Sequence, residues 1–477
     1  MLFNSLEFVL FLPLVYVLYW ILRNNSHSKQ NVLLLLASYF FYACWDWRFL
    51  FLLLFSTVLD YVVGIKIENS KTKKAVWLWS SIIINVGFLG FFKYYNFFVD
   101  SFSSMLNNFN IHVNTSSLNI ILPIGISFYT FHGLSYVIDI YQGKIKAERN
   151  FIDYSLFVSF FPLLVAGPIE RATHLLPQLK RKRVFSYHQS VDGLRQILWG
   201  LAKKVIIADG AAVFVNQIFD NYQDFNGSTL LLGVILFAFQ IYGDFSGYSD
   251  IAIGTAKLFG INLLKNFNYP YFSRDIAEFW RRWHISLTTW FRDYIYIPLG
   301  GSRGGLFQKI KNTFIIFLIS GFWHGANWTF IFWGLLNALL FIPLLLRNKN
   351  RSHLGNVAEG RIFPNWRETI QMISTFLLTT LAWTFFRSPS ISDAFNYLKG
   401  IFNSSLFEKI MVEDTLTIQF LIVLFILIEW KGRNDNFGIE KLGLTWNKHL
   451  RYALYYVIII ALFWFAGKEQ EFIYFQF

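Results

Sequence analysis

The chain has 477 residues, of which 55% are hydrophobic and only 15% are charged. Apolar runs of about 15 to 20 residues recur along its whole length, and each is long enough to span the hydrocarbon core of a bilayer. This composition excludes a soluble protein and, because the runs are continuous rather than alternating, a transmembrane β-barrel. We expect an all-α polytopic membrane protein whose residues 1–477 form a single integral-membrane domain.

The net charge of +13 comes from short clusters of Lys and Arg between the apolar runs. Such clusters are typical of positive-inside loops, so we expect the lipid bilayer as a partner and no binding of nucleic acid. The single cysteine, Cys44, excludes an intrachain disulfide and a cysteine-based metal cluster. The first apolar run lacks a basic n-region and a cleavage site, which favours a retained span over a removed signal peptide.

The charges between the first apolar runs predict the direction of each crossing. These runs are 6–22, 31–44, 46–66, 75–92 and 118–140. The basic links 23–29 and 66–74 should be cytoplasmic, which places the N-terminus outside and Trp45–Trp47 in an outer turn. The stretch 101–119 contains no charged residue and is predicted to be an outer loop.

Two later runs have basic residues at both ends, which a single crossing cannot have. For 151–169, a re-entrant hairpin broken at Pro162 or Gly167–Pro168 resolves the conflict. Run 312–346 must hold either two short crossings or another broken element, with His324 near the turning point.

The remaining runs complete an odd number of crossings. They are 196–219, 229–249, 368–387, 415–430 and 452–466. We expect about eleven transmembrane helices in total, plus re-entrant and interfacial helices, with the C-terminal "FIYFQF" outside. No internal repeat is visible, so an inverted-repeat transporter gains no support.

The segment 273–301, "SRDIAEFWRRWHISLTTWFRDYIYIPLGG", has apolar residues at spacings of three and four. This pattern predicts one amphipathic helix in the membrane interface, with His284 at the edge of its apolar arc. The opposite face is basic and would suit the phosphates of a nucleotide-containing ligand. A plain membrane-surface helix with a structural histidine explains the same pattern.

His324 lies in the strongly apolar run 318–334, "LISGFWHGANWTFIFWG". Ionisable residues within membrane spans are functional by default, although a structural histidine bonded to a neighbouring helix is the alternative. An apolar site favours the neutral imidazole, which suits a general base. If this stretch is helical, Asn327 and Trp328 share the face of His324, and Asn327 could orient the imidazole.

Other chemistries find little support. A zinc site needs three or more ligands, and His284 with His324 supplies only two without an HExxH motif, so we expect no metal. No GxSxG motif is present, which argues against a serine hydrolase. Asp244 and Asp250, in "YGDFSGYSD", are more typical of helix caps or ion-pair partners than of catalysts.

Three long motifs resemble one family. These are "QIYGDFSGYSDIAIG" (240–254), "NFNYPYFSRDIAEFWRRWHISLTTWFRDYIYIPLGG" (266–301) and "ISGFWHGANWTFIFWG" (319–334). They are similar to motifs of the membrane-bound O-acyltransferase (MBOAT) family, with the bacterial alginate O-acetylases as the nearest branch. The stretch 160–179 and the terminal "FIYFQF" are also similar to that branch, so the resemblance covers nearly the whole chain.

The resemblance implies a helical fold around a tunnel, with His324 and His284 as catalytic residues at its constriction. It implies acetyl-CoA as a cytoplasmic acyl donor and no bound cofactor. The acetyl group would reach an extracytoplasmic polysaccharide through a partner acetyltransferase, in the cytoplasmic (inner) membrane of a bacterium. Residues expected to support catalysis or bind the donor are Asn327, Trp323, Trp328, Arg281, Arg282, Trp283 and Asp293.

Two alternatives stay open. A D-alanyl transferase for teichoic acid belongs to a sister branch with the same two-histidine core. A transporter or flippase is the alternative from another class, but it would require charged residues spread over several spans. The acceptor, whether alginate, another exopolysaccharide, peptidoglycan or a small molecule, is not specified by the sequence.

Overall fold

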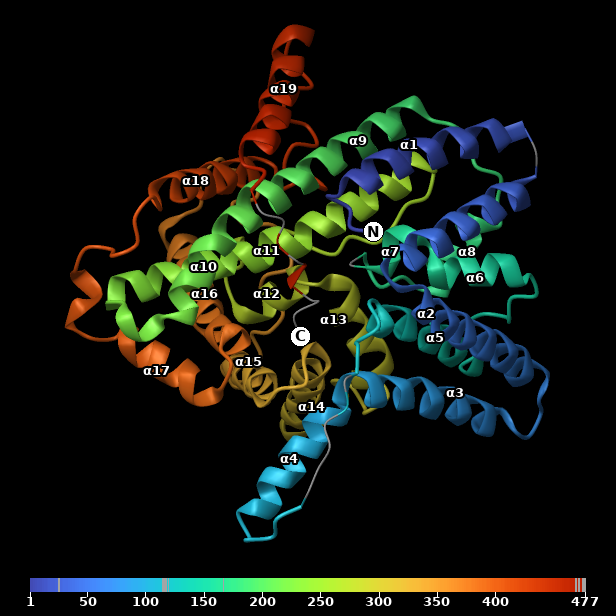
Figure 1. Ribbon diagram of the computed structural model, residues 1–477, viewed down its shortest axis with the longest axis horizontal. Coiled ribbons are helices and arrows are strands. Elements are labelled where there is room, and N and C mark those ends of the chain that lie inside the picture. Colours follow the sequence, from blue (N-terminus) through green and yellow to red (C-terminus); the bar gives the residue numbers. More distant parts are fainter. Residues whose placement is uncertain are drawn as a thin grey trace. The chain divides into compact units, whose positions relative to one another are not determined.

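The computed structural model describes the chain except for residues 25, 114–117, 119, 166, 468, 469, 471 and 474–477 (Figure 1). The described residues form helices and no strand, as the composition predicts. They divide into two compact units, Met1–Ser190 with Ala256–Leu264 and Val191–Thr255 with Lys265–Phe477. The single domain expected for 1–477 stays a prediction, and the two units are described separately below.

The first unit is arranged around one long helix, α2, which packs against α1, α3, α5, α6 and α7. Its elements are α1 (Leu6–Ile21), η1 (Leu22–Asn24), α2 (His27–Asn69), α3 (Lys74–Leu89), η2 (Gly90–Tyr94), α4 (Tyr95–Asn107), α5 (Ile126–Tyr141), α6 (Phe151–Ser159), α7 (Phe161–Leu164) and α8 (Ala172–Leu179). A straight helix of 43 residues would be roughly 65 Å long, about twice the hydrocarbon core. Asp46 interrupts α2 with extended dihedral angles (φ −154°, ψ 110°), so the predicted turn at Trp45–Trp47 is confirmed as a kink between two arms.

The predicted break near Pro162 is also confirmed. Helix α6 ends at Ser159, Phe160 is non-helical, and Pro162 lies in the first turn of α7, where a missing N–H is harmless. The outer loop predicted for 101–119 is wrong in its first part, because the helical ribbon that starts at Lys74 continues to Asn107. Residues 114–117 and 119 of that loop, and residues 474–477 of "FIYFQF", lie outside the described residues.

The second unit contains the three motifs. Its elements are α9 (Tyr187–Leu201), η3 (Ala202–Asp209), α10 (Gly210–Asp220), η4 (Tyr222–Asp224), α11 (Gly227–Leu258), η5 (Pro270–Phe272), α12 (Ile276–Arg282), α13 (Ile285–Phe291), η6 (Arg292–Tyr296), α14 (Leu306–His324), α15 (Trp328–Leu346), α16 (Trp366–Arg387), α17 (Ile391–Ile401), η7 (Ser404–Phe407), α18 (Leu416–Lys431) and α19 (Lys448–Trp464). The first residues of α9 and the last of α11 belong to the first unit.

Helices α14 and α15 form a tight hairpin, and α16 packs against α15. The two helices approach closely at glycines: a Cβ on Gly321 would lie 2.3 Å from the Phe330 carbonyl oxygen, and one on Gly334 would lie 2.3 Å from that of Phe317. His324 is the last residue of α14. The expected break in run 312–346, with His324 near the turning point, is therefore confirmed, and two membrane crossings in this run stay a prediction.

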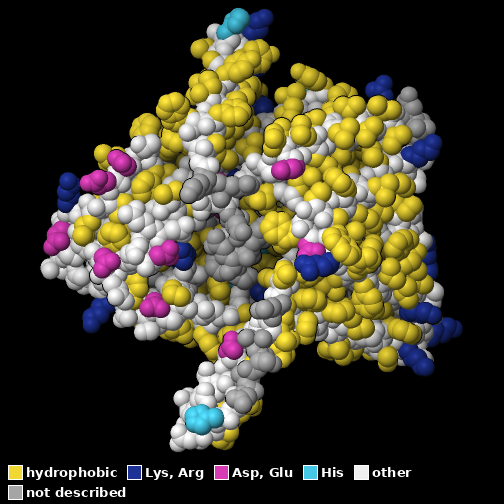
Figure 2. Space-filling view, in the orientation of Figure 1, with side chains coloured by type: hydrophobic (Ala, Val, Ile, Leu, Met, Phe, Trp, Pro, Cys, Tyr) yellow, Lys and Arg dark blue, Asp and Glu magenta, His cyan; other side chains and the backbone are white. Residues whose placement is uncertain are grey.

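Five described helices are long and apolar enough to cross a membrane, namely those over 27–69, 74–107, 227–258, 328–346 and 366–387. This number does not confirm the expected total of about eleven transmembrane helices. The two arms of the kinked α2 are counted in it as one helix. Large apolar side chains are exposed in the described part of the chain, such as Phe463 at 79% and Trp464 at 82%. Hydrophobic side chains cover much of the face shown in Figure 2, with scattered Lys and Arg, as expected for helices that face lipid.

Candidate functional site

His284 and His324 line the same cavity within the second unit. The cavity has a volume of about 50 Å³, and its other walls come from α12, α13 and α14. Both imidazoles are buried, with 1% of His284 and 3% of His324 exposed. Two titratable groups with apolar surroundings around one cavity are the arrangement expected of a reaction site.

His284 lies at a break in the helix that the sequence predicted to be continuous. Helix α12 ends at Arg282 and α13 begins at Ile285, and His284 has left-handed dihedral angles (φ 44°, ψ 54°). Segment 266–268 holds this break from both sides. The Ile285 N–H donates to the Asn266 carbonyl at 2.8 Å, and the Asn268 N–H donates to the Arg282 carbonyl at 2.9 Å.

The single interfacial helix expected over 273–301 is therefore wrong, because backbone bonds to another segment replace helical bonds at the break. The apolar arc is buried inside the unit, and Glu278 and Arg282 on the supposed polar face are buried as well. A left-handed non-glycine residue costs roughly 1–3 kcal/mol and persists only where its surroundings impose it. Such strain is typical of functional sites.

The His284 imidazole has no hydrogen-bond partner for either ring nitrogen among the described residues. Aromatic rings surround it instead, with Phe245 at 4.5 Å, Trp323 at 6.0 Å and Phe267 at 6.4 Å between ring centroids. Burial lowers the pKa of His284 to about 3, since removing water penalises the imidazolium. The ring is therefore neutral at physiological pH.

His324 lies in an aromatic box. The ring centroids of Trp323, Trp333 and Phe386 are 4.9, 5.1 and 5.3 Å from that of His324. Trp323 contacts both histidine rings, so this predicted site residue connects the two. Trp283, also a predicted site residue, is 1% exposed and lines the cavity.

A family model described as MBOAT, membrane-bound O-acyltransferase family, matches residues 144–386. This range includes both histidines and every element that lines the cavity. The chain belongs to the MBOAT family. It is therefore a membrane protein and an O-acyltransferase, as the resemblance of its motifs predicted.

Among its relatives, the probable alginate O-acetylase AlgI of Pseudomonas aeruginosa is 40% identical over 407 residues, which are 84% of this chain and 75% of that protein. The peptidoglycan O-acetyltransferase of Helicobacter pylori is 34% identical over 529 aligned positions, covering 100% of this chain and 98% of that protein. The teichoic acid D-alanyltransferase of Bacillus subtilis is 30% identical over 240 residues, 46% of this chain. This MBOAT protein is thus similar to the O-acetylase branch over a longer stretch than to the D-alanyl branch.

The helical face predicted for Asn327 and Trp328 is not formed. Helix α14 ends at His324, and Asn327 caps the next helix: its side-chain oxygen accepts from the Thr329 N–H at 3.0 Å and its amide donates to the Pro389 carbonyl at 3.1 Å. Trp328 is 55% exposed. Gly325 stops the helix before the face can form, so the MBOAT site gains no orienting amide from this turn.

The predicted donor-binding arginines are engaged with backbone carbonyls. Arg281 donates to the backbone carbonyls of Asn350 and His353. Arg282 donates to the backbone carbonyls of Asn268 and Gly355. It also donates to the side chains of Glu278 and Asn356. Asp293 pairs with Arg292 at 2.7 Å. None of these three side chains lines the cavity, and their predicted role in binding the donor stays a prediction.

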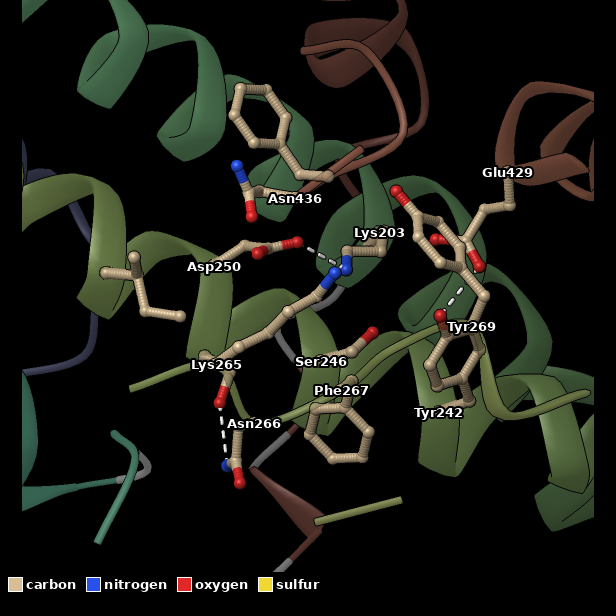
Figure 3. A pocket seen from close by; sticks show the side chains of 13 residues that line it. Lys203, Tyr242, Ser246, Asp250, Lys265, Asn266, Phe267, Tyr269, Glu429 and Asn436 are labelled. Atoms are coloured by element: carbon tan, nitrogen blue, oxygen red, sulfur yellow. Dashed lines mark hydrogen bonds and ion pairs between the residues drawn. The ribbon is translucent and has the colours of Figure 1, made fainter. Parts of the chain in front are cut away.

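A second, polar pocket lies in the same unit and is drawn in Figure 3. Lys203 pairs with Asp250 at 2.5 Å, Tyr242 donates to Glu429 at 2.6 Å, and Lys265 donates to Asn268 at 2.8 Å. Burial lowers the pKa of Lys265 to about 8. Asp250 pairs with Lys203, and Asp244 pairs with Lys204 at 2.8 Å. Both aspartates are thus ion-pair partners, which confirms one of the two structural roles expected for them.

Two parts of the site were not found in the sequence. Asn266 fixes the His284 turn with its side chain, which accepts from the Ser286 hydroxyl and donates to Ser249, both at 2.9 Å. Near the end of the chain, Gln470 accepts from Lys204 at 3.1 Å and the Ile473 N–H donates to Asp244 at 2.7 Å. Phe472 is fully buried and packs against Phe245 and Tyr248. No local pattern marks these contacts, since each joins residues far apart in the chain.

Among the described residues, no group of three or more His, Cys, Asp or Glu side chains could hold a metal ion.

Proposed function

We propose that the protein transfers an acetyl group from cytoplasmic acetyl-CoA across the membrane for O-acetylation of an extracytoplasmic polysaccharide. The observation that carries this proposal is that two buried imidazoles, His284 and His324, line one cavity in an MBOAT protein. Its similar relatives are named for O-acetylation of alginate and of peptidoglycan, which supports acetyl as the acyl group and a glycan as the acceptor.

In the proposed reaction, the His324 imidazole takes the proton of the acceptor hydroxyl. The hydroxyl oxygen then forms a bond to the thioester carbonyl carbon, and the carbon–sulfur bond breaks. The imidazolium returns its proton to the departing thiolate, so the products are the ester and free CoA. The neutral His284, which has no hydrogen-bond partner among the described residues, positions or polarises the thioester in the same cavity.

The same proposal includes the arrangement in the cell. The chain acts as one integral domain in a bacterial inner membrane, with both termini outside and a separate extracytoplasmic transferase that delivers the acetyl group. The basic clusters between apolar runs support the predicted sidedness. Neither the donor nor the acceptor is a resident cofactor, because both are consumed in each turnover.

The first experiment measures CoA release from acetyl-CoA by the purified protein. His324→Ala should lower the rate by roughly 10²-fold or more, because proton transfer by a positioned base contributes that much. His188→Ala is the matched control, since His188 is an exposed histidine of α9 that does not line the cavity and should leave the rate unchanged. A well-folded His324→Ala protein with near-normal activity would remove His324 from the mechanism.

A measurement on cells separates the alternatives. Alkali-labile acetate on surface and secreted glycans is compared in cells with the wild-type protein, with His324→Ala and without the gene. Loss of acetate in both altered strains supports the proposal and identifies the glycan. Loss of D-alanine ester with unchanged acetate favours the D-alanyl transferase, for which the Bacillus subtilis relative is a precedent. No change in any ester favours a transporter.

A further inference from the structure

One side chain that lines the cavity between the histidines carries a polar atom for which the proposed mechanism gives no role. Trp280, on α12, lines the cavity and is 9% exposed. Its indole Nε1 is buried and has no hydrogen-bond partner among the described residues. A buried donor without a partner costs about 1–3 kcal/mol, so such donors are rare unless a ligand or water completes them.

The Trp280 ring is held in place by its neighbours. Its centroid lies 5.4 Å from that of Phe317 and 5.5 Å from that of Trp333, both at steep interplanar angles. Trp333 in turn contacts the His324 ring at 5.1 Å. The indole is therefore packed into the same aromatic cluster as the proposed base, and the position of its N–H is fixed relative to that base.

The size and lining of the cavity suit a small acyl group. A volume of about 50 Å³ has room for three to five water-sized groups, and an acetyl group has three non-hydrogen atoms. Leu287, Phe291 and Phe317 provide apolar walls for a methyl group. Trp280 Nε1 is a donor at the same cavity, and a carbonyl oxygen is the acceptor that an acetyl thioester would bring to it.

We propose that this cavity binds the acetyl group of the donor, with the Trp280 indole N–H donating to its carbonyl oxygen and Leu287 limiting the length of the acyl chain. The proposal rests on the proposed function. As the acceptor oxygen attacks, the carbonyl oxygen gains negative charge and its hydrogen bond to Trp280 strengthens. When the carbon–sulfur bond breaks, an electron pair of that oxygen re-forms the carbonyl double bond, and the thiolate leaves with the negative charge. A donor of this kind lowers the barrier without taking or giving a proton.

The first test removes the N–H and keeps an aromatic, although smaller, ring. Trp280→Phe should lower kcat for acetyl-CoA by about 10²-fold with little change in KM, because the bond is strongest in the transition state. Trp199→Phe is the matched control, since Trp199 is 4% exposed, has an Nε1 that likewise lacks a partner among the described residues, and does not line the cavity. It should keep the wild-type kcat.

Replacement of Trp280 by β-(3-benzothienyl)alanine covers the case in which Trp280→Phe fails to fold. This residue has sulfur in place of the N–H in a ring of nearly the same shape, so packing is preserved. It should show the same loss of kcat. A normal kcat in either folded protein, or a rise in KM alone, overturns the role of Trp280.

The second test measures chain length. In Leu287→Ala, kcat/KM for hexanoyl-CoA relative to acetyl-CoA should rise about tenfold or more, because the lost side chain opens the apolar wall. Leu236→Ala removes the same volume from a buried leucine that does not line the cavity and should leave the ratio unchanged. An unchanged ratio in Leu287→Ala, or an equal rise in Leu236→Ala, overturns the role of the cavity.

The wild-type protein separates this proposal from the one on which it rests. If it transfers acetyl from acetyl-CoA but the Trp280 and Leu287 variants behave like their controls, the proposed function stands and the acetyl site is refuted. If it transfers no acyl group from any CoA thioester, both proposals fail.

Discussion

Two pockets of the second unit use buried polar groups in opposite ways. In the polar pocket, each charged side chain has a partner: Lys203 pairs with Asp250, Glu429 accepts from Tyr242, and Lys265 donates to Asn268. In the cavity between the histidines, both nitrogens of His284 lack a partner among the described residues. Phe267 connects the two, since it lines the polar pocket and its ring stacks on that of His284, which lines the cavity. From this difference we predict that the polar pocket stabilises the fold, whereas the cavity, as proposed above, is completed by the substrate.

The largest effect should come from breaking the polar pocket. In Lys203→Met, the buried Asp250 carboxylate loses its cation, which should lower the stability by about 3–5 kcal/mol. The unfolding temperature of the purified protein in detergent measures this. The double variant Lys203→Met/Asp250→Leu should recover most of the loss, because no unpaired charge is left. A stable single variant would contradict the structural role.

In the cavity between the histidines, a substitution should lower activity without lowering stability. In His284→Leu, acyl transfer should fall by roughly 10²-fold. The stability should be equal or higher, since an imidazole without partners is replaced by an apolar side chain. The rate of CoA release checks the expected loss of acyl transfer. The unfolding temperature of the same preparation checks the expected stability. A strongly destabilised His284→Leu protein would show that the cavity is structural like the polar pocket.

Lowering the pH should reveal the contribution of the His284 imidazole to stability. The pKa of His284 is about 3 in the folded protein and about 6.5 when unfolded, so the unfolded chain binds more protons between these values. Stability is therefore fully present above about pH 6.5 and is lost as the pH falls, by about 2 kcal/mol at pH 5. The difference in unfolding temperature between the wild type and His284→Leu, followed from pH 7 to pH 5, isolates this contribution. If the unfolding temperatures of the two proteins change in parallel with pH, the contribution of His284 is refuted.

The smallest effect concerns the turn that holds His284. Asn266→Ala removes the side-chain bonds to Ser286 and Ser249 but keeps the backbone bond to Ile285. We expect a loss of about 1 kcal/mol in stability and a several-fold lower rate of acyl transfer, because the left-handed turn is held less firmly. Asn262→Ala, which removes another side-chain amide from the same loop region, is the control. Equal rates in both variants would show that the side chain of Asn266 does not position His284.

The sequence predicted those features that local patterns determine. Continuous apolar runs predicted helices, basic residues on both flanks of 151–169 predicted the break near Pro162, and an imidazole in an apolar run singled out His324. The break at His284 was missed, because it depends on backbone bonds from segment 266–268 that no helical pattern reveals. The expected pairing of Asn327 with His324 failed for a local reason, since the Gly325 turn ends the helix.

The contacts of Gln470, Phe472 and Ile473 have a consequence for the order in which parts of the enzyme acquire their neighbours during synthesis. Gln470, Phe472 and Ile473 leave the ribosome after the helices that they contact, so Lys204 and Asp244 are inserted before their last backbone partners exist. Phe245, which lies against His284, lacks the Phe472 ring until then. The surroundings of one catalytic candidate are thus completed only after Phe472 has been synthesised, and a chain stopped before this residue would lack the ring that packs against Phe245.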